Sequence, residues 1–367
     1  MEEMMAPATA PGARPVLHLH IGTPKTGTSA IQAFLPLNRD AFREATGIHY
    51  AESESDVRAL KGKPTAGNGA QIARHLRARK RESFDKAMRM LNRDLAGGHP
   101  RLLLSSEAFW GLPDDRFADL AAALKGQVEI KVLAYARPQV KHVESAYLQV
   151  LGNRGLKGDI VEFFDGQNRK FFIGTRLRFL QSLFGRDNVT VRKYDRKTLV
   201  GGDIIDDVLD VFGAAWGPQF KRPAEVNSSL DPEHYIYARM VAEAANGHAV
   251  GKRSMRDLRS QPLISALYDE ASGIENLQVM DPATARRIAD LYREDNELLD
   301  TLVGGSGFGF NADNEKAVAA IEAAADKKPT GFTRLELMLL NRLAQVEARL
   351  DELTGAGEGA EAGEDED

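Results

Sequence analysis

Apolar residues along the chain fall into short uninterrupted runs, separated by longer segments in which they recur with a helical period. The short runs predict buried strands at residues 16–21, 47–52, 101–107, 128–136 and 188–194. The periodic segments predict helices at residues 28–45, 70–96, 114–124, 139–151 and 203–212. Strands that alternate with helices are joined by right-handed crossovers, so the pattern predicts an α/β fold whose parallel sheet of about five strands is flanked by helices.

The helical pattern is interrupted in two places. Pro36 lies inside the first predicted helix and is expected to kink it or split it. The segment 70–96 is expected to form two helices rather than one. From residue 231 to about residue 302 the pattern is helical only, which predicts a helical C-terminal region after the sheet.

The two ends of the chain differ in composition from its body. Residues 1–14 are polar and rich in alanine and proline, so we expect a disordered lead-in, followed by one domain at 15–305. A helical extension is predicted at 306–354 and a disordered tail at 355–367. The tail holds six acidic residues and no basic one, and setting them aside leaves 47 of the 53 acids against 48 bases. The formal net charge of −5 therefore belongs to the tail, and the body is about neutral.

The predicted C-terminal extension carries apolar residues at alternating spacings of four and three, namely Leu339, Leu343, Val346, Leu350 and Leu353. This spacing is typical of a coiled-coil seam, through which the chain would form a homodimer, although about two heptads are fewer than a coiled coil usually needs. A terminal helix that packs on its own domain explains the pattern equally well.

The composition, with 43% apolar and 28% charged residues over 367 positions, is that of a globular protein. The absence of cysteine excludes disulfides, thiolate metal sites and a cysteine nucleophile, and it favours a reducing compartment. No apolar run approaches the length of a membrane span, so we expect no membrane partner and a cytoplasmic location. The basic cluster at 74–81 predicts a solvated helix face rather than a nucleic-acid site, because no nucleic-acid motif accompanies it.

Residues 22–29 link the first predicted strand to the first predicted helix. Gly22 and Gly27 bound a turn tight enough to bring backbone N–H groups around an anion. Thr28 and Ser29 open a helix whose unpaired N–H groups and positive dipole end face the same point. The sequence therefore predicts a phosphate-binding loop at this position.

This loop differs from a Walker A loop, whose pattern is G-x-x-x-x-G-K-[ST]. Thr28 stands where the lysine should be, and the lysine lies inside the turn, as Lys25. The loop instead resembles the 5′-phosphosulfate-binding loop of sulfotransferases that use 3′-phosphoadenosine 5′-phosphosulfate (PAPS), a P-loop-like superfamily with the rough pattern T/S-x-P-K-[ST]-G-T-[ST]. The chain lacks only the residue between the threonine and the proline. The resemblance implies that PAPS is bound by Thr23, Pro24, Lys25, Thr26, Gly27, Thr28 and Ser29.

A second motif follows the strand predicted at 128–136, at the edge where open parallel sheets bind ligands. The strand runs into Arg137 and Pro138, and Ser145 follows eight residues after the arginine. Sulfotransferases hold the 3′-phosphate of PAPS with an arginine and a serine at this spacing, so the resemblance implies that role for Arg137 and Ser145. Pro138 takes a position that is usually polar in the family. The alternative is an arginine in a surface ion pair.

The strand predicted at 188–194 ends at Tyr194 and resembles a later strand of the family, in which a tyrosine flanks the adenine. The alternative for Tyr194 is a packed tyrosine at a strand end. Where the family often has a tryptophan that covers the other face of the adenine, this chain has Ala30. Lys252 and Arg253 are a weak match to the basic loop with which the family closes on the 3′-phosphate.

The strand predicted at 101–107 ends in Glu107, where cytosolic sulfotransferases carry a catalytic histidine. Other branches of the superfamily use a glutamate, so the resemblance implies that Glu107 is the general base that accepts the proton of the attacking hydroxyl. The alternative is a glutamate that caps the residues after it or pairs with a lysine. His18 and His20 share one face of the first strand and are interpreted as core histidines bonded to backbone.

The order of these motifs predicts a sulfotransferase that moves the sulfuryl group of PAPS to a hydroxyl or amine and releases PAP, with Lys25 offsetting charge on the bridging oxygen. The resemblance implies a carbohydrate acceptor and a reaction that needs no metal. One alternative is a P-loop kinase or other NTP-binding enzyme, against which the missing Walker lysine counts. The other is a non-catalytic PAP- or PAPS-binding scaffold protein that acts through its C-terminal helix and acidic tail.

Overall fold

A computed structural model of the chain describes residues 14–63, 65–154, 159–223 and 279–325. Contacts divide the chain into two units, the first made of Met1–Ala146, Val161–Ser229 and Ala283–Val318, and the second of Tyr147–Ile160, Leu230–Pro282 and Ala319–Asp367. The sheet and every predicted site residue belong to the first unit. The boundary predicted after residue 305 falls inside that unit. The predicted coiled-coil seam, the acidic tail, Lys252 and Arg253 lie outside the described residues.

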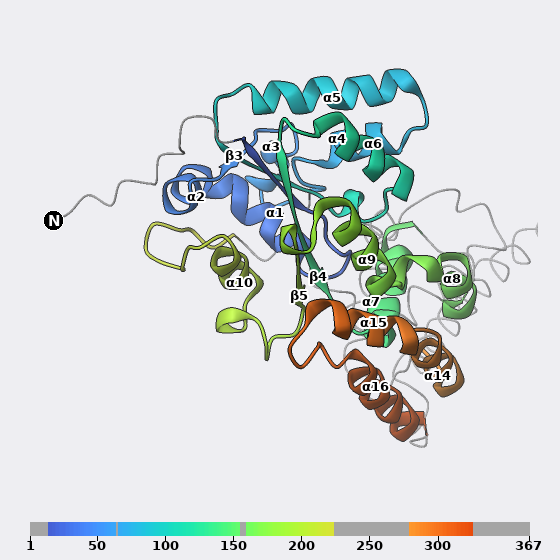
Figure 1. Cartoon of the computed structure of the whole chain (residues 1–367). Helices are drawn as coiled ribbons and strands as arrows, with labels where there is room; N and C mark the ends of the chain where they lie inside the picture. Colours follow the sequence, from blue (N-terminus) through green and yellow to red (C-terminus); the bar gives the residue numbers. More distant parts are fainter. Residues whose placement is uncertain (1–13, 64, 155–158, 224–278, 326–367) are drawn as a thin grey trace, which may run out of the picture. The chain divides into compact units, whose positions relative to one another are not determined.

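Five strands form one parallel sheet in the order β2-β3-β1-β4-β5 (Figure 1), which confirms the predicted α/β fold. The strands are β1 (Val16–His20), β2 (His49–Tyr50), β3 (Arg101–Ser105), β4 (Glu129–Ala136) and β5 (Val189–Lys193). At the end of the central strand β1, His20 lies opposite Ser105 of β3 and Leu133 of β4. The carboxyl ends of these strands therefore reach the same edge of the sheet, which is where the predicted site residues follow.

The described helices are α1 (Thr28–Leu37), α2 (Arg39–Thr46), α3 (Asp56–Ala59), α4 (Ala70–Arg77), α5 (Arg81–Leu95), α6 (Asp114–Leu124), α7 (Gln139–Arg154), α8 (Ile160–Gln167), α9 (Ile173–Phe184), α10 (Ile204–Val211), α14 (Pro282–Leu291), α15 (Arg293–Val303) and α16 (Phe310–Ala325). The segment 70–96 forms two helices, as predicted. The first predicted helix is split at Asn38, just after Pro36, and the Asn38 side-chain amide donates to the carbonyl of Phe34 at 2.9 Å.

Two predicted strands are shorter than expected. The strand predicted at 47–52 covers only two residues, because Gly47 ends α2 in the left-handed conformation, with φ 69°, and cannot begin an extended strand. The strand predicted at 101–107 ends at Ser105. Ser106 then caps a 3₁₀ turn, η1 (Glu107–Phe109), by accepting a hydrogen bond from the Ala108 N–H at 3.2 Å. Glu107 therefore lies on this turn and not on the strand itself.

Apolar clusters cover both faces of the sheet, because alternate residues of a strand point to opposite sides. On one face, Leu17 and Leu19 pack with residues of α4, α5, α6 and α9. On the other face, Leu103 and Leu133 pack with residues of α1, α2 and α10. Figure 1 shows α1 and α10 on one side of the strands and α4, α5 and α6 on the other. With both faces covered, the edges at the strand ends are left for binding.

His18 and His20 lie in the buried layer, which confirms that they are core histidines. Burial lowers the pKa of His18 to about 3 and that of His20 to about 4, so both are neutral near pH 7. The predicted bond to backbone is wrong for His20, because its Nδ1 pairs with the hydroxyl of Ser105 at 2.8 Å. The His18 ring packs edge-on against Phe212, with 5.4 Å between ring centres.

Candidate functional site

The predicted phosphate-binding loop begins as an extension of the sheet. The N–H of Ile21 donates to the carbonyl of Leu133 at 2.9 Å, and the N–H of Thr23 donates to that of Tyr135 at 2.9 Å. Between these bonds, the N–H of Tyr135 donates to the carbonyl of Gly22 at 2.6 Å. The chain is therefore held against β4 until Thr23 and turns only after it.

Three residues of the loop have positive φ, namely Gly22 at 103°, Lys25 at 64° and Gly27 at 78°. A side chain at Gly27 would crowd the neighbouring elements, since a Cβ there would lie 3.0 Å from Ile204 and 3.1 Å from Tyr194. The loop is also closed by its own side chains, because the buried Thr26 hydroxyl donates to the carbonyl of Thr23 at 2.6 Å. The hydroxyl of Thr26 therefore stabilises the loop from inside.

Several backbone donors of the turn have no partner among the described residues. Helix α1 has no side-chain cap among the described residues, and Gly27 in the left-handed conformation precedes it. Within the same part of the chain, the N–H groups of Lys25, Thr26, Gly27 and Thr28 donate no hydrogen bond to backbone or side chains. Unsatisfied N–H groups at the positive end of a helix dipole attract an anion. The loop thus has the features of an anion cradle.

Arg137 and Lys25 meet at this cradle from different elements. Arg137 follows β4, and its Nη1 donates to the backbone carbonyl of Lys25 at 3.1 Å. Burial lowers the pKa of the Lys25 ammonium, and the charge of Arg137 lowers it further, whereas Glu107 raises it. Burial likewise lowers the pKa of the Arg137 guanidinium. Two partly buried cations that repel each other are stabilised when an anion lies between them.

Tyr194 and Ser145 lie at the same edge of the sheet. The Tyr194 ring lies beside the loop at Gly27, and the Arg137 guanidinium is 6.0 Å from its centre. Ser145 is half-buried on α7, and the described residues include no hydrogen bond between its hydroxyl and Arg137. The structure therefore brings Lys25, Arg137 and Tyr194 together. Ser145 lies on α7, the helix that follows Arg137, and is not bonded to the arginine in the described part of the chain.

Glu107 lies beside the start of α1. The Thr28 hydroxyl donates to its carboxylate at 3.0 Å, and the Glu107 backbone lies 3.4 Å from the place a Cβ on Gly22 would occupy. The side chain does not cap the residues after it. Only its backbone carbonyl does so, by accepting a hydrogen bond from the Trp110 N–H at 3.2 Å. A carboxylate therefore lies at the cradle, together with the Lys25 ammonium on which its charge acts.

Sequence reasoning missed two residues of α7 near the cradle. His142 is buried, and its pKa falls to about 3 through burial and the positive charges of Arg137 and Lys25. The backbone of Pro24, in the loop, acts in the opposite direction and raises the pKa of His142. Burial raises the pKa of the Glu144 carboxyl, while Arg137 acts in the opposite direction. No spacing in the sequence distinguishes these residues from ordinary helix positions.

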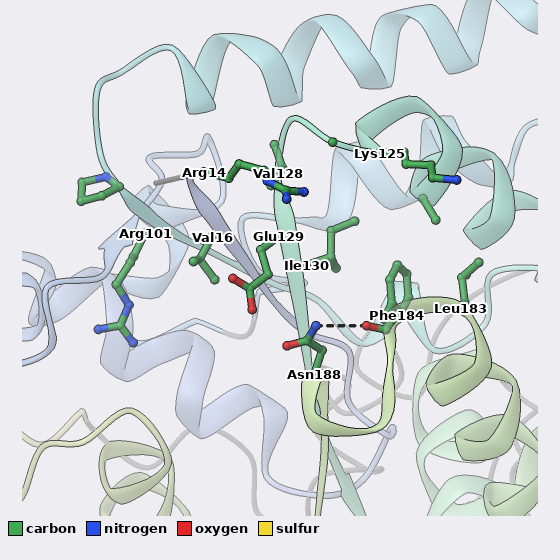
Figure 2. A pocket seen from close by; sticks show the side chains of 13 residues that line it. Arg14, Val16, Arg101, Lys125, Val128, Glu129, Ile130, Leu183, Phe184 and Asn188 are labelled. Atoms are coloured by element: carbon green, nitrogen blue, oxygen red, sulfur yellow. Dashed lines mark hydrogen bonds between the residues drawn. The ribbon is translucent and has the colours of Figure 1, made fainter. Parts of the chain in front are cut away.

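A separate cavity of about 550 Å³ lies at the opposite edge of the sheet (Figure 2). Val16, Arg101 and Glu129, which begin β1, β3 and β4, are among its lining residues. Figure 2 also shows the Asn188 side-chain amide donating to the Phe184 carbonyl, at 3.0 Å. Because the cradle follows the carboxyl ends of the strands, this cavity is not part of the candidate site.

No protein-family model matches the chain, and no curated protein matches it. Among solved structures, a sulfotransferase from Alicyclobacillus acidocaldarius matches 67% of this chain and 99% of its own chain, with 15% identical residues and a TM-score of 0.34. A similarity at this TM-score supports no inference about function. Of the helices described, none is both long enough and apolar enough to span a membrane. The described His, Asp and Glu side chains form no group of three that could hold a metal ion.

Proposed function

We propose that the chain is a PAPS-dependent sulfotransferase, which moves the sulfuryl group of PAPS to a hydroxyl or amine and releases PAP. One observation carries the proposal: Lys25 and Arg137 meet at a loop whose backbone donors lack partners among the described residues. Thr28 at the Walker lysine position argues against a nucleoside triphosphatase. We take a carbohydrate as the acceptor class, following the sequence resemblance.

The chemistry of PAPS fits these residues. PAPS has anionic groups on both sides of its ribose, and the site offers a cation and N–H donors from the loop together with a guanidinium from β4. Residues 23–29 would hold the 5′-phosphosulfate, and Arg137 and Ser145 would hold the 3′-phosphate. Tyr194 would lie against the adenine. When bound, PAPS supplies an activated sulfuryl group.

The remaining roles belong to Lys25 and Glu107. Lys25 would neutralise charge that develops on the leaving phosphate oxygen, as a preorganised cation does in phosphoryl transfer. Glu107 would accept the proton of the acceptor hydroxyl, and the hydrogen bond from Thr28 would fix the direction of its carboxylate. The two side chains also act on each other, because the Glu107 charge favours protonated Lys25.

The proposal is tested by incubating the protein with PAPS and separate sets of carbohydrates, phenols and amines, and by detecting PAP and sulfated product by mass spectrometry. We expect PAP to form only when an acceptor is present. The Lys25→Ala variant should lose most turnover, and the matched control Lys125→Ala should keep it, because Lys125 is exposed and lies at the opposite edge of the sheet.

Two results would contradict the proposal in different ways. Transfer of phosphate from ATP, with none of sulfate from PAPS, would assign the protein to the kinases. PAP binding without transfer to any of the three acceptor classes would instead support a non-catalytic binding protein. Both results concern the proposed function alone, and neither would change the description of the fold.

A further inference from the structure

We propose that three buried amide side chains, Gln139, Asn296 and Asn314, position Arg137 and thereby set the preference of the site for a 3′-phosphorylated nucleotide. We call them the amide cluster. The inference deepens the proposed function and rests on it. None of the three residues contacts the ligand in this proposal, so each is a positioning residue, which acts through the arginine.

The amide cluster is closed by hydrogen bonds between its own members. The Gln139 Nε2 donates to the Asn296 Oδ1 at 2.7 Å, and the Asn296 Nδ2 donates back to the Gln139 Oε1 at 3.1 Å. The Asn314 Nδ2 donates to the same Gln139 oxygen at 2.9 Å. All three residues are at most 1% exposed. Buried amides stabilise one arrangement only when their partners are in place, so the cluster fixes the relative positions of α7, α15 and α16.

Asn314 also takes the place of a missing helix cap. The N–H of Val140, in the first turn of α7, donates to the Asn314 Oδ1 at 3.2 Å. Pro138, just before this helix, has no side-chain oxygen that could accept from the first N–H groups of the helix. The start of α7 is therefore held by a side chain from α16, far away in the sequence.

The connection to Arg137 is short. The backbone passes from Ala136, the last residue of β4, through Arg137 and Pro138 to Gln139. On the strand side, the carbonyl of Ala136 accepts a hydrogen bond from the N–H of Tyr194 at 2.7 Å. Arg137 is thus fixed between a ladder bond on one side and the amide cluster on the other, with no freely rotating linker between them.

The start of α16 holds the neighbouring strand end as well. The Lys193 Nζ contacts the Asp313 carboxylate at 2.5 Å and donates to the Phe308 carbonyl at 2.8 Å. Asp313 and Asn314 are adjacent, so one turn of α16 is bonded both to the start of α7, which follows β4, and to the end of β5. The residues that would contact the nucleotide from these two strands are Arg137 and Tyr194, which explains why α16 bears on specificity.

The test compares the affinities for PAP and ADP by calorimetric titration of the full-length protein. ADP lacks the 3′-phosphate and has a second phosphate on its 5′ side, so the change in the ratio of the two affinities between wild type and variant, rather than its absolute value, reports on Arg137. Asn314→Ala leaves the Val140 N–H without its acceptor and takes one of two donors from the Gln139 Oε1, which keeps the bond from Asn296. We expect this change to lower the preference for PAP about tenfold while ADP affinity changes little. Asn314→Asp, which keeps an oxygen for Val140, should retain part of the preference and serves if the alanine variant does not fold.

The matched control is Asn38→Ala. Asn38 is also a buried asparagine, and its side chain donates to the Phe34 and Lys221 carbonyls and accepts from the Lys221 N–H. It lies between α1 and α2, so its loss should reduce stability without changing the ratio. An unchanged ratio in Asn314→Ala, or equal losses of PAP and ADP affinity, would overturn the inference alone. Equal affinities in the wild type would instead refute the proposed function, and the inference with it.

Discussion

Replacing Lys25 by alanine and by glycine separates two ways in which this residue destabilises the unbound fold. Its backbone has φ 64°, a region that residues with a Cβ rarely adopt. Its ammonium is partly buried beside Arg137, and both burial and that charge lower its pKa. At pH 7 the charged form is therefore less favourable in the folded state than in the unfolded state. Lys25→Ala removes the charge and keeps the backbone conformation, whereas Lys25→Gly relieves both.

The size of the backbone effect follows from the conformation. The left-handed region costs a residue with a Cβ about 1–2 kcal/mol, and the greater freedom of unfolded glycine offsets about 0.5–1 kcal/mol of that. Lys25→Gly should therefore be more stable than Lys25→Ala by about 0.5–1 kcal/mol, a rise of about 1–3 °C in Tm. Both variants should bind PAP more weakly than the wild type.

The charge effect has a sign that a pH series can check. The pKa of Lys25 is lowered in the folded state, so the unfolded chain keeps this proton to a higher pH than the folded chain does. The stability of the wild type therefore rises as the pH approaches the ordinary lysine value of 10.5. Lys25→Ala lacks this rise, so its advantage over the wild type at pH 7 should shrink towards pH 10.5 in thermal melts. If both variants melted below the wild type at pH 7, Lys25 would be a structural residue, and the case for its role in binding would fail.

Three further predictions concern other parts of the fold. Glu107→Gln should lower kcat by about 10²–10⁴-fold with nearly unchanged PAP affinity, and near-normal turnover would place the general base elsewhere. Asp207→Ala should lower the free energy of unfolding by about 3–5 kcal/mol in urea, because it removes the acceptor of the buried Tyr135 hydroxyl and leaves Arg192 only its longer contact with Asp210; a loss below about 1 kcal/mol would contradict this. Since the pKa of His20 is lowered to about 4, stability should fall as the pH drops from 6.5, and His20→Gln should show a shallower fall.

Much of the sheet could be predicted from local patterns. The strands of a covered parallel sheet are continuous apolar runs, so β1, β4 and β5 were recognisable, and α6 has its predicted bounds. The turn at residues 22–29 could also be predicted, because its conformation depends on Gly22 and Gly27, which are close in sequence. The short strand β2 was overestimated, since apolar pattern alone does not reveal that Gly47 ends a helix.

The side-chain contacts of the site could not be predicted in the same way. The bond from Thr28 to Glu107 joins residues 79 positions apart, and it depends on β1 and β3 being neighbours in register. The bond from Arg137 to the Lys25 carbonyl depends likewise on the pairing of β1 with β4. The contact between Gln139 and Asn314 spans 175 positions and links elements whose order in space no local period reveals. Sequence patterns therefore identified candidate residues at strand ends. Which of these residues contact each other could be learned only from the fold.

The most direct test of the central claim is the affinity of the wild-type protein for PAP relative to ADP, titrated without Mg²⁺. Both nucleotides are adenosines with a phosphate on the 5′ oxygen, to which ADP adds a second phosphate, and only PAP has a 3′-phosphate that Arg137 would bind. A charge-assisted hydrogen bond to the guanidinium should make PAP bind about 10–100-fold more tightly, and Arg137→Ala should remove most of that preference. Equal affinities for PAP and ADP in the wild type would contradict the account.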